Sequence, residues 1–267
     1  MTGGAPVWDP AQYAAFASDR ARPFHDLVAR IGASAPRRVV DLGCGPGALT
    51  ATLAARWPDA QVIGIDAASS MLDEAAALGE RFPNLRFERG DIADWRPDHR
   101  DDVVVTNAAL QWVPTHVELL PTWLAALAPG AWFAMQVPGN FGSPSHALMR
   151  SIGAQAPFAA ALDGVLRADP VLDAPGYLSL MLDAGFDAVA WETTYMQVLQ
   201  GEDPVLEWTR GTGLRPALQA LDAADASGTM RRSYEQAYAV ALREAYPAGR
   251  HGTVYPFRRV FAAGVRR

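Results

Sequence analysis

Val39-Val40-Asp41-Leu42-Gly43-Cys44-Gly45-Pro46-Gly47 is the stretch of this sequence that decides its fold. Val39 and Val40 are β-branched and apolar, which favours a strand buried on both faces. Three glycines follow at alternate positions, and glycine tolerates positive φ and a close approach to the backbone. The apolar-periodic run 48–55 then predicts a helix. A strand, a glycine turn and a helix N-terminus in this order are typical of a nucleotide-cofactor site in a doubly wound α/β fold.

The spacing of the glycines leaves two classes of cofactor open. Gly43, Gly45 and Ala48 meet the pattern G-x-G-x-x-A, so an NAD-type oxidoreductase is one interpretation. However, the carboxylate of Asp41 would repel the pyrophosphate that a helix N-terminus attracts. Asp41 suits a cationic ligand group instead, such as the ammonium of S-adenosylmethionine, which carries no phosphate. A tight strand-to-helix turn that binds no ligand is the remaining alternative.

Composition limits the partners and the chemistry. The 267 residues are 50% hydrophobic, which is enough for one large domain or a core with a cap. The net charge of −6 argues against nucleic acid as a partner. All basic residues other than histidine are arginines, so a Schiff-base lysine is excluded and an anionic substrate must be held by Arg or His.

Two further features bear on location and metals. Cys44 is the single cysteine, so neither an internal disulfide nor a cysteine metal cluster is possible, and the scattered histidines give no reason to expect a metal. The N-terminus lacks a signal-peptide pattern, and no apolar run is long enough to span a membrane. We therefore expect a cytoplasmic protein with no membrane partner, as a monomer or weak homo-oligomer.

Polar residues follow several of the expected strands, which cover 62–66, 84–89, 101–106 and 131–137. Asp66 lies 25 positions after Asp41, where an acidic side chain can accept the ribose hydroxyls. Asp91 can accept the adenine amino group or can instead cap the following helical turn. Because the carboxyl ends of parallel strands share one edge of the sheet, Asn107, Gln111 and Trp112 should face the cofactor and the second substrate.

Material outside this core predicts a lid and a cap. Residues 1–36 read as N-terminal helices whose Tyr13 and Arg22 either fold over the cofactor or pack on the sheet. Residues 37–137 form the expected cofactor-binding core. Segments 138–170 and 200–248 are the expected helical cap insertions, and strands at 186–199 and 253–265 complete the sheet. All 267 residues are expected to form a single domain.

Several segments together resemble one family, the trans-aconitate 2-methyltransferases, which are class I S-adenosylmethionine-dependent enzymes. The resemblance is carried over nearly the whole chain by residues 8–16, 20–23, 41–47, 64–66, 91–95, 107–112 and 211–216. It implies a Rossmann-like, mostly parallel sheet of seven strands with the last one antiparallel. It also implies that S-adenosylmethionine donates a methyl group to a carboxylate of a small polycarboxylic acid. The chain departs from the family pattern in its absence of lysine and in the alanine-rich segment 153–170.

The motifs and the resemblance give a set of candidate site residues. The expected cofactor contacts are Asp41, Gly43, Cys44, Gly45, Asp66, Ala67, Met71, Asp91, Ile92, Asn107, Leu110, Tyr13 and Arg22. The expected acceptor contacts are Arg215, Trp112, Gln111, His146 and Tyr255. No catalytic base is expected, because a carboxylate acceptor is already ionised at neutral pH. A methyltransferase with a nitrogen or carbon acceptor and a non-catalytic S-adenosylmethionine-binding module remain the alternatives.

Overall fold

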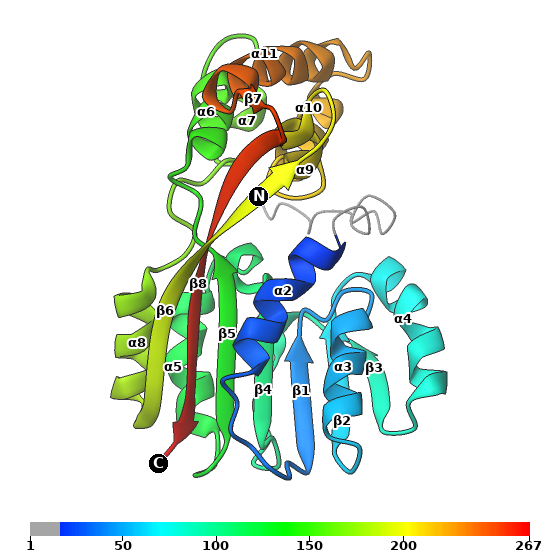
Figure 1. Ribbon diagram of the computed structural model, residues 1–267, viewed down its shortest axis with the longest axis vertical. Helices are drawn as coiled ribbons and strands as arrows, with labels where there is room; N and C mark the ends of the chain where they lie inside the picture. The colour runs from blue at the N-terminus through cyan, green and yellow to red at the C-terminus, as the bar shows by residue number, and fades with distance from the viewer. Residues whose placement is uncertain (1–16) are drawn as a thin grey trace. The chain divides into compact units, whose positions relative to one another are not determined.

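A computed structural model describes residues 17–267 of the chain, with side chains from Ala21 onward (Figure 1). The strands are β1 (Arg38–Leu42), β2 (Gln61–Asp66), β3 (Leu85–Arg89), β4 (Val103–Asn107), β5 (Trp132–Pro138), β6 (Phe186–Leu199), β7 (Ala248–Gly249) and β8 (Gly252–Arg266). The α-helices are α2 (Ala17–Val28), α3 (Ala48–Arg56), α4 (Ser69–Arg81), α5 (His116–Ala126), α6 (Pro144–Gly153), α7 (Ala159–Leu162), α8 (Ala174–Asp183), α9 (Pro204–Arg210), α10 (Arg215–Ala224) and α11 (Thr229–Ala245). Two 3₁₀ turns, η1 (Ile92–Asp94) and η2 (Leu110–Trp112), follow strands.

The sheet has the strand order β3-β2-β1-β4-β5-β8-β6, with the short β7 paired to β8 (Figure 1). Strands β1 to β5 pair in parallel, and β8 is antiparallel to β5. The expected doubly wound, mostly parallel sheet is therefore confirmed, and the two-residue β7 is an addition to the seven expected strands. The central strand β4 is almost entirely buried, while the edge strand β3 alternates between exposed and covered side chains.

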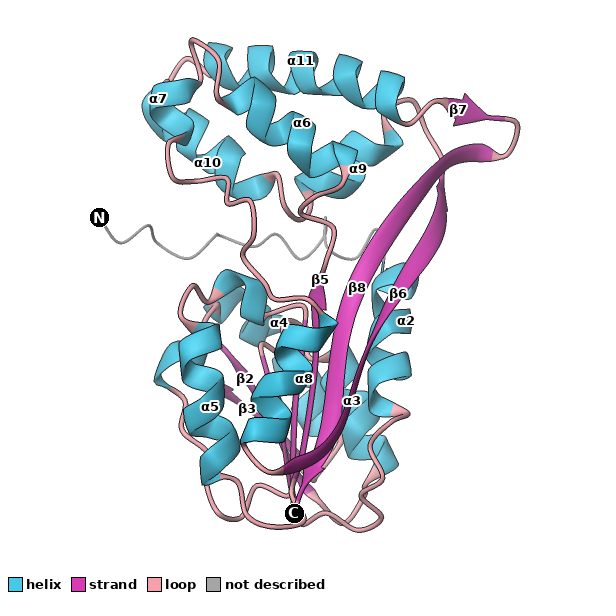
Figure 2. Ribbon diagram, turned by 90° about the vertical axis from the view of Figure 1, so that its left-hand side faces the viewer, coloured by secondary structure: helices cyan, strands magenta, loops and turns pink. Residues whose placement is uncertain are grey.

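The described residues divide into two units. We call residues 17–139, 171–193 and 259–267 the sheet unit, and residues 140–170 and 194–258 the helical unit. In the sheet unit, α2 and α3 lie on one face of the sheet and α5 and α8 lie on the other (Figure 2). Each unit has a hydrophobic core of its own, centred on Phe133 and Trp123 in the sheet unit and on Trp208 and Tyr238 in the helical unit.

Three helices show how packing and local hydrogen bonds set their course. Helix α2 continues through Pro23, whose buried ring packs inside the protein. Helix α4 begins at Ser69, and its N-cap Ala68 makes no side-chain hydrogen bond. At the start of α8, Asp173 Oδ1 accepts from the Gly176 N–H at 2.9 Å.

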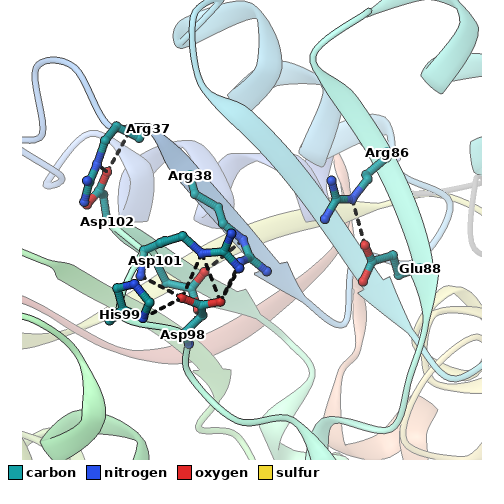
Figure 3. A network of polar contacts seen from close by, with 9 residues as sticks. Arg37, Arg38, Arg86, Glu88, Asp98, His99, Asp101 and Asp102 are labelled. Carbon is teal, nitrogen blue, oxygen red and sulfur yellow. Dashed lines mark hydrogen bonds and ion pairs between the residues drawn. The ribbon is translucent and has the colours of Figure 1, made fainter.

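Ion pairs join β1 to β4 at their amino ends, away from the glycine turn (Figure 3). Arg37 Nη2 lies 2.8 Å from Asp102 Oδ1, and the hydrogen bond from the Arg37 side chain lowers the pKa of Asp102. Arg38 Nε lies 3.1 Å from Asp101 Oδ1, whose pKa is raised by burial. The network fixes the register of the two strands that carry the site at their opposite ends. In residues 17–267, no helix combines the length and the apolar composition needed to cross a membrane.

Candidate active site

The glycine turn after β1 uses its three glycines in two different ways. Gly43, Gly45 and Gly47 have φ values of +78°, +55° and +77°, which other residues rarely adopt. A Cβ at Gly43 would lie 2.3 Å from Ala109 Cβ, and one at Gly47 would lie 2.5 Å from Phe87 Cζ. Among the residues that the structure describes, a Cβ at Gly45 would meet nothing within 4 Å. Gly43 and Gly47 therefore serve packing, whereas the backbone at Gly45 is open to a ligand.

Asp41 is a buried carboxyl group beside this turn. Asp41 is only 3% exposed, and Thr50 Oγ1 of α3 donates to Asp41 Oδ2 at 2.7 Å. Burial raises the pKa of Asp41 to about 7, although the Thr50 hydrogen bond opposes the shift, and the negative charge of Asp66 adds to it. A cationic ligand group near Asp41 would favour the ionised form, so the site is suited to positive charge.

Asp66 ties the end of β2 to the glycine turn. Its Oδ2 accepts from the Gly45 N–H and its Oδ1 from the Ala68 N–H, both at 2.9 Å. Asp66 is half-buried, and its neighbour Ala67 is exposed, so this strand end remains accessible. Met71, in the first turn of α4, is 3% exposed and belongs to the buried core.

The segment after β3 shows the capping role that the sequence allowed for Asp91, whereas its contact with adenine stays a prediction. Asp91 is exposed, and its Oδ1 accepts from the Ala93 N–H at 2.8 Å, which caps η1. Ile92 is buried, and a Cβ at Gly43 would lie 3.3 Å from its Cδ1, so Ile92 borders the glycine turn. In this segment the apolar side chain of Ile92 is buried and the carboxylate of Asp91 is exposed.

A strained residue follows β4. Ala108 has φ +54°, and its carbonyl oxygen accepts from Gln111 Nε2 at 2.5 Å. Leu110 is fully buried, Trp112 is half-buried, and Asn107 Oδ1 has no hydrogen-bond partner among residues 17–267. The turn holds Asn107 and Gln111 at the carboxyl end of the sheet, where ligands bind in this fold class.

His116 and Tyr177 form a buried pair next to the end of that turn. His116 Nδ1 lies 2.8 Å from the Val113 carbonyl oxygen, which can only accept, so this nitrogen carries the proton. His116 Nε2 lies 2.8 Å from the Tyr177 hydroxyl oxygen. The same hydroxyl oxygen accepts from the Leu172 N–H at 3.3 Å. This chain links η2 to the segment that leads into α8.

The candidate acceptor residues of the helical unit lie in different environments. Arg215 is half-buried and is the first residue of α10. Tyr255 is fully buried, with its hydroxyl oxygen 3.1 Å from Ser145 Oγ. His146 Nδ1 lies 3.3 Å from the same Ser145 Oγ, and burial together with Arg150 lowers the pKa of His146 to about 4. His146 is consequently neutral at physiological pH.

Two predicted cofactor residues belong to the N-terminal segment. Arg22 is exposed on α2, and Tyr13 falls outside the described residues. Cys44 is buried in the turn, and burial raises the pKa of its thiol, so it is held as a neutral group. Cys44 therefore serves as a small packing residue within the glycine turn.

Sequence reasoning missed several polar partners of the site. Thr50 could have been suspected, because the first turn of the helix after a glycine turn faces the preceding strand. Gln136 and Arg259 are hydrogen-bonded across 123 positions, and Ser145 contacts Tyr255 across 110. No local sequence pattern predicts such contacts, since they depend on how distant strands and helices pack together.

The arrangement is suited to a ligand with a cationic end and no phosphate. The open backbone of Gly45 and the buried Asp41 lie at the end of β1, and Asp66, Asp91 and Ile92 continue along the same edge of the sheet. Among residues 17–267, no group of three His, Cys, Asp or Glu side chains is arranged to hold a metal. These residues fit an amino-acid group, a ribose and a base in that order.

Comparisons with known proteins agree with this geometry. Residues 39–130 match the model of a methyltransferase domain family. The chain is 50% identical to the trans-aconitate 2-methyltransferase of Streptomyces coelicolor, over 98% of this chain and 88% of the relative. It is 48% identical to the trans-aconitate 2-methyltransferase of Rhodococcus jostii, over 96% and 98%. A solved structure of geranyl diphosphate C-methyltransferase from Streptomyces coelicolor, with S-adenosyl-L-homocysteine bound, has a similar fold, with a TM-score of 0.53, 17% identity, and coverage of 99% and 88%.

Proposed function

Since this chain belongs to the trans-aconitate 2-methyltransferase family, we propose that it transfers a methyl group from S-adenosylmethionine to a carboxylate of trans-aconitate. It is an S-adenosylmethionine-dependent methyltransferase that acts on a small molecule. The observation that carries the proposal is the buried Asp41 beside the open backbone of Gly45, because this pair suits a cationic cofactor.

The cofactor would be held along the edge formed by β1, β2, β3 and β4. Asp41 would bind the ammonium group and the open backbone of Gly45 the remainder of the methionine part, with Asp66 at the ribose and Ile92 against the adenine. Burial raises the pKa of Asp41 to about 7, and a bound ammonium group would favour its ionised form. The capping bond of Asp91 uses one of its two carboxylate oxygens, which leaves the other for the adenine amino group.

The acceptor would need arginine and neutral hydrogen-bonding groups. Arg215 remains the first candidate, as a guanidinium that can bind a carboxylate with two parallel hydrogen bonds. Gln111 and Trp112 would form the wall beside the reacting methyl group. His146 and Tyr255 would contribute neutral groups only, in view of the lowered pKa of His146 and the buried hydroxyl of Tyr255.

The reaction requires no proton transfer by the protein. S-adenosylmethionine supplies an electrophilic methyl group on a sulfonium sulfur. A carboxylate with an ordinary pKa near 4 is already a nucleophile at neutral pH, so no general base is needed. The contribution of the chain is to align the acceptor oxygen with the methyl group, and such alignment is worth roughly 7–11 kcal/mol in favourable cases.

Transfer of a labelled methyl group to a set of acids tests the function. Trans-aconitate, cis-aconitate, citrate and isocitrate are each incubated with labelled S-adenosylmethionine and the full chain. We expect a base-labile methyl ester with trans-aconitate at a higher kcat/KM than with the other three. The absence of an ester from all four acids would remove the proposed acceptor class.

A further inference from the structure

Three polar side chains of the sheet unit share one face near the carboxyl end of β5. Asn107 of β4 is paired in register with Gln136 of β5, which is paired in turn with Phe261 of β8. Arg259 lies two residues before Phe261 and opposite Pro138. Residues paired in register point to the same face, as do residues two apart on a strand, so Asn107, Gln136 and Arg259 share a face.

The same face carries the buried carboxyl group of the candidate cofactor site. Asp41 of β1 is paired in register with Val105, which lies two residues before Asn107. A polar row therefore runs from Asp41 across β4 and β5 to β8. The carboxyl group of Asp41 lies at one end of this row and the guanidinium of Arg259 at the other.

Arg259 and Gln136 form a buried pair with net positive charge. Arg259 is 5% exposed and Gln136 is fully buried, and Arg259 Nη1 donates to Gln136 Oε1 at 3.2 Å. The Gln136 amide carries no charge, so the positive charge of this pair is that of the guanidinium. A guanidinium also offers five N–H donors in a fixed plane, which matches the geometry of a carboxylate.

Two amide atoms in the row are unsatisfied. Gln136 Nε2 is buried and has no hydrogen-bond partner within the described part of the chain, and the same holds for Asn107 Oδ1. Buried polar atoms are nearly always hydrogen-bonded, so each of these atoms is suited to meeting a ligand. Gln136 Nε2 is a donor and suits an anion, whereas Asn107 Oδ1 is an acceptor and suits a cation or an N–H group.

The backbone around Arg259 is held firmly. Phe261 stacks on Trp191, with ring centroids 4.8 Å apart and an interplanar angle of 6°. The guanidinium of Arg30 lies over Trp191, 5.2 Å from the ring centroid. These ring contacts hold Phe261, which lies two residues after Arg259 on β8.

Resting on the proposed function, we propose that Arg259 and Gln136 bind a carboxylate of the acceptor other than the one that is methylated. Esterification of one carboxylate of a polycarboxylic acid leaves other anionic groups, each of which needs a donor. The Arg259 guanidinium and the Gln136 N–H group supply donors and a positive charge together. Asn107, with its acceptor oxygen, separates this anion site from the cofactor. The pair thereby selects polycarboxylates over monocarboxylic acids.

Three variants test this assignment. Arg259→Met removes the charge at similar length, and Gln136→Glu places a carboxylate beside Arg259 without changing the size of the side chain. Arg30→Met is the matched control, because Arg30 stacks on the same face of the sheet but is exposed. Measured quantities are the KM and kcat for trans-aconitate, the Kd of S-adenosylmethionine and the melting temperature. We expect Arg259→Met and Gln136→Glu to raise the acceptor KM about 10- to 100-fold, with the cofactor Kd changed less than threefold. The control should change neither constant.

The outcomes separate this proposal from the proposed function. An unchanged acceptor KM in folded variants would overturn the assignment. An equal rise in the acceptor KM and the cofactor Kd would also overturn it, because Arg259 would then contact the cofactor and not the acceptor. If Arg259→Met does not fold, the near-isosteric Gln136→Glu decides alone. If the wild-type chain forms no ester, calorimetry of trans-aconitate binding to the complex with S-adenosylhomocysteine still tests the pair. In that assay, equal affinity of wild type and Gln136→Glu would refute it.

Discussion

The buried carboxyl group of Asp41 is expected to lower the stability of the folded chain at neutral pH while it binds the cofactor. The pKa of its carboxyl group is about 7 in the folded chain against 3.8 for an ordinary Asp, so the folded state holds a proton that the unfolded state releases above pH 4. The contribution of this group to stability is therefore fully present below pH 4 and is lost as the pH rises to about 7. At one pKa unit per 1.4 kcal/mol, the loss is at most about 4 kcal/mol.

Asp41→Asn should consequently stabilise the protein without ligand at pH 8 but not at pH 4.5. The Asn side chain keeps an acceptor for Thr50 Oγ1 and carries no charge. Melting curves of wild type and variant at both pH values measure the effect, and calorimetry should show at least tenfold weaker binding of S-adenosylmethionine. A variant that is less stable than wild type at pH 8 would contradict the shifted pKa.

Arg215 provides a second prediction at the scale of the residue. Arg215→Ala should raise the KM for the acceptor at least tenfold and leave the Kd of S-adenosylmethionine nearly unchanged, because a charged hydrogen bond to the acceptor is lost. Steady-state kinetics and calorimetry give the two constants. Arg232→Ala, at an exposed arginine of α11, is the control. Equal weakening of both constants, or of neither, would remove Arg215 from the acceptor site.

At the scale of the element, the glycine turn separates packing from ligand clearance. Gly43→Ala would place a methyl group 2.3 Å from Ala109 Cβ in a left-handed conformation, so we expect a destabilisation of about 2 kcal/mol or more. The methyl group of Gly45→Ala would meet no atom of the described residues within 4 Å, so this change should cost only about 1–2 kcal/mol of backbone strain. Its methyl group would stand where the cofactor approaches, and S-adenosylmethionine binding should fall at least tenfold.

Denaturant unfolding and cofactor titration of the two glycine variants distinguish these roles. If Gly45→Ala bound the cofactor as tightly as wild type, the backbone at Gly45 would not be the ligand surface. If Gly43→Ala were as stable as wild type, Ala109 would have to move by more than close packing normally allows.

Local sequence patterns predicted elements better than contacts. The strands expected at 84–89 and 101–106 are observed as β3 and β4, because the alternation and β-branched residues that favour a strand are local properties. The glycine turn and Asp41 were predictable for the same reason. The bond from Arg259 to Gln136 was not, because it depends on the antiparallel register of β5 and β8, and neither was the continuation of α2 through Pro23, because packing there overrides the usual breaking effect of proline.

At the scale of the whole molecule, the proposed cofactor contacts among the described residues all belong to the sheet unit, whereas Arg215 belongs to the helical unit. The two units have separate cores, so a ligand can stabilise one without changing local opening in the other. The expected cap role of segments 138–170 and 200–248 stays a prediction. Binding of cofactor and of acceptor should therefore leave different protection patterns.

Hydrogen exchange measured with S-adenosylhomocysteine alone, and then with added trans-aconitate, checks this division. A ligand at 100 times its Kd stabilises the state that it binds by about 2.7 kcal/mol, which slows exchange through openings of that state about 100-fold. With S-adenosylhomocysteine alone, peptides that cover 43–47, 66–68 and 91–95 should become protected, and peptides that cover 215–224 should not. Added trans-aconitate should extend protection to 215–224 in wild type and not in Arg215→Ala. Protection of 215–224 by S-adenosylhomocysteine alone would contradict this division, because Arg215 would then respond to the cofactor and not to the acceptor.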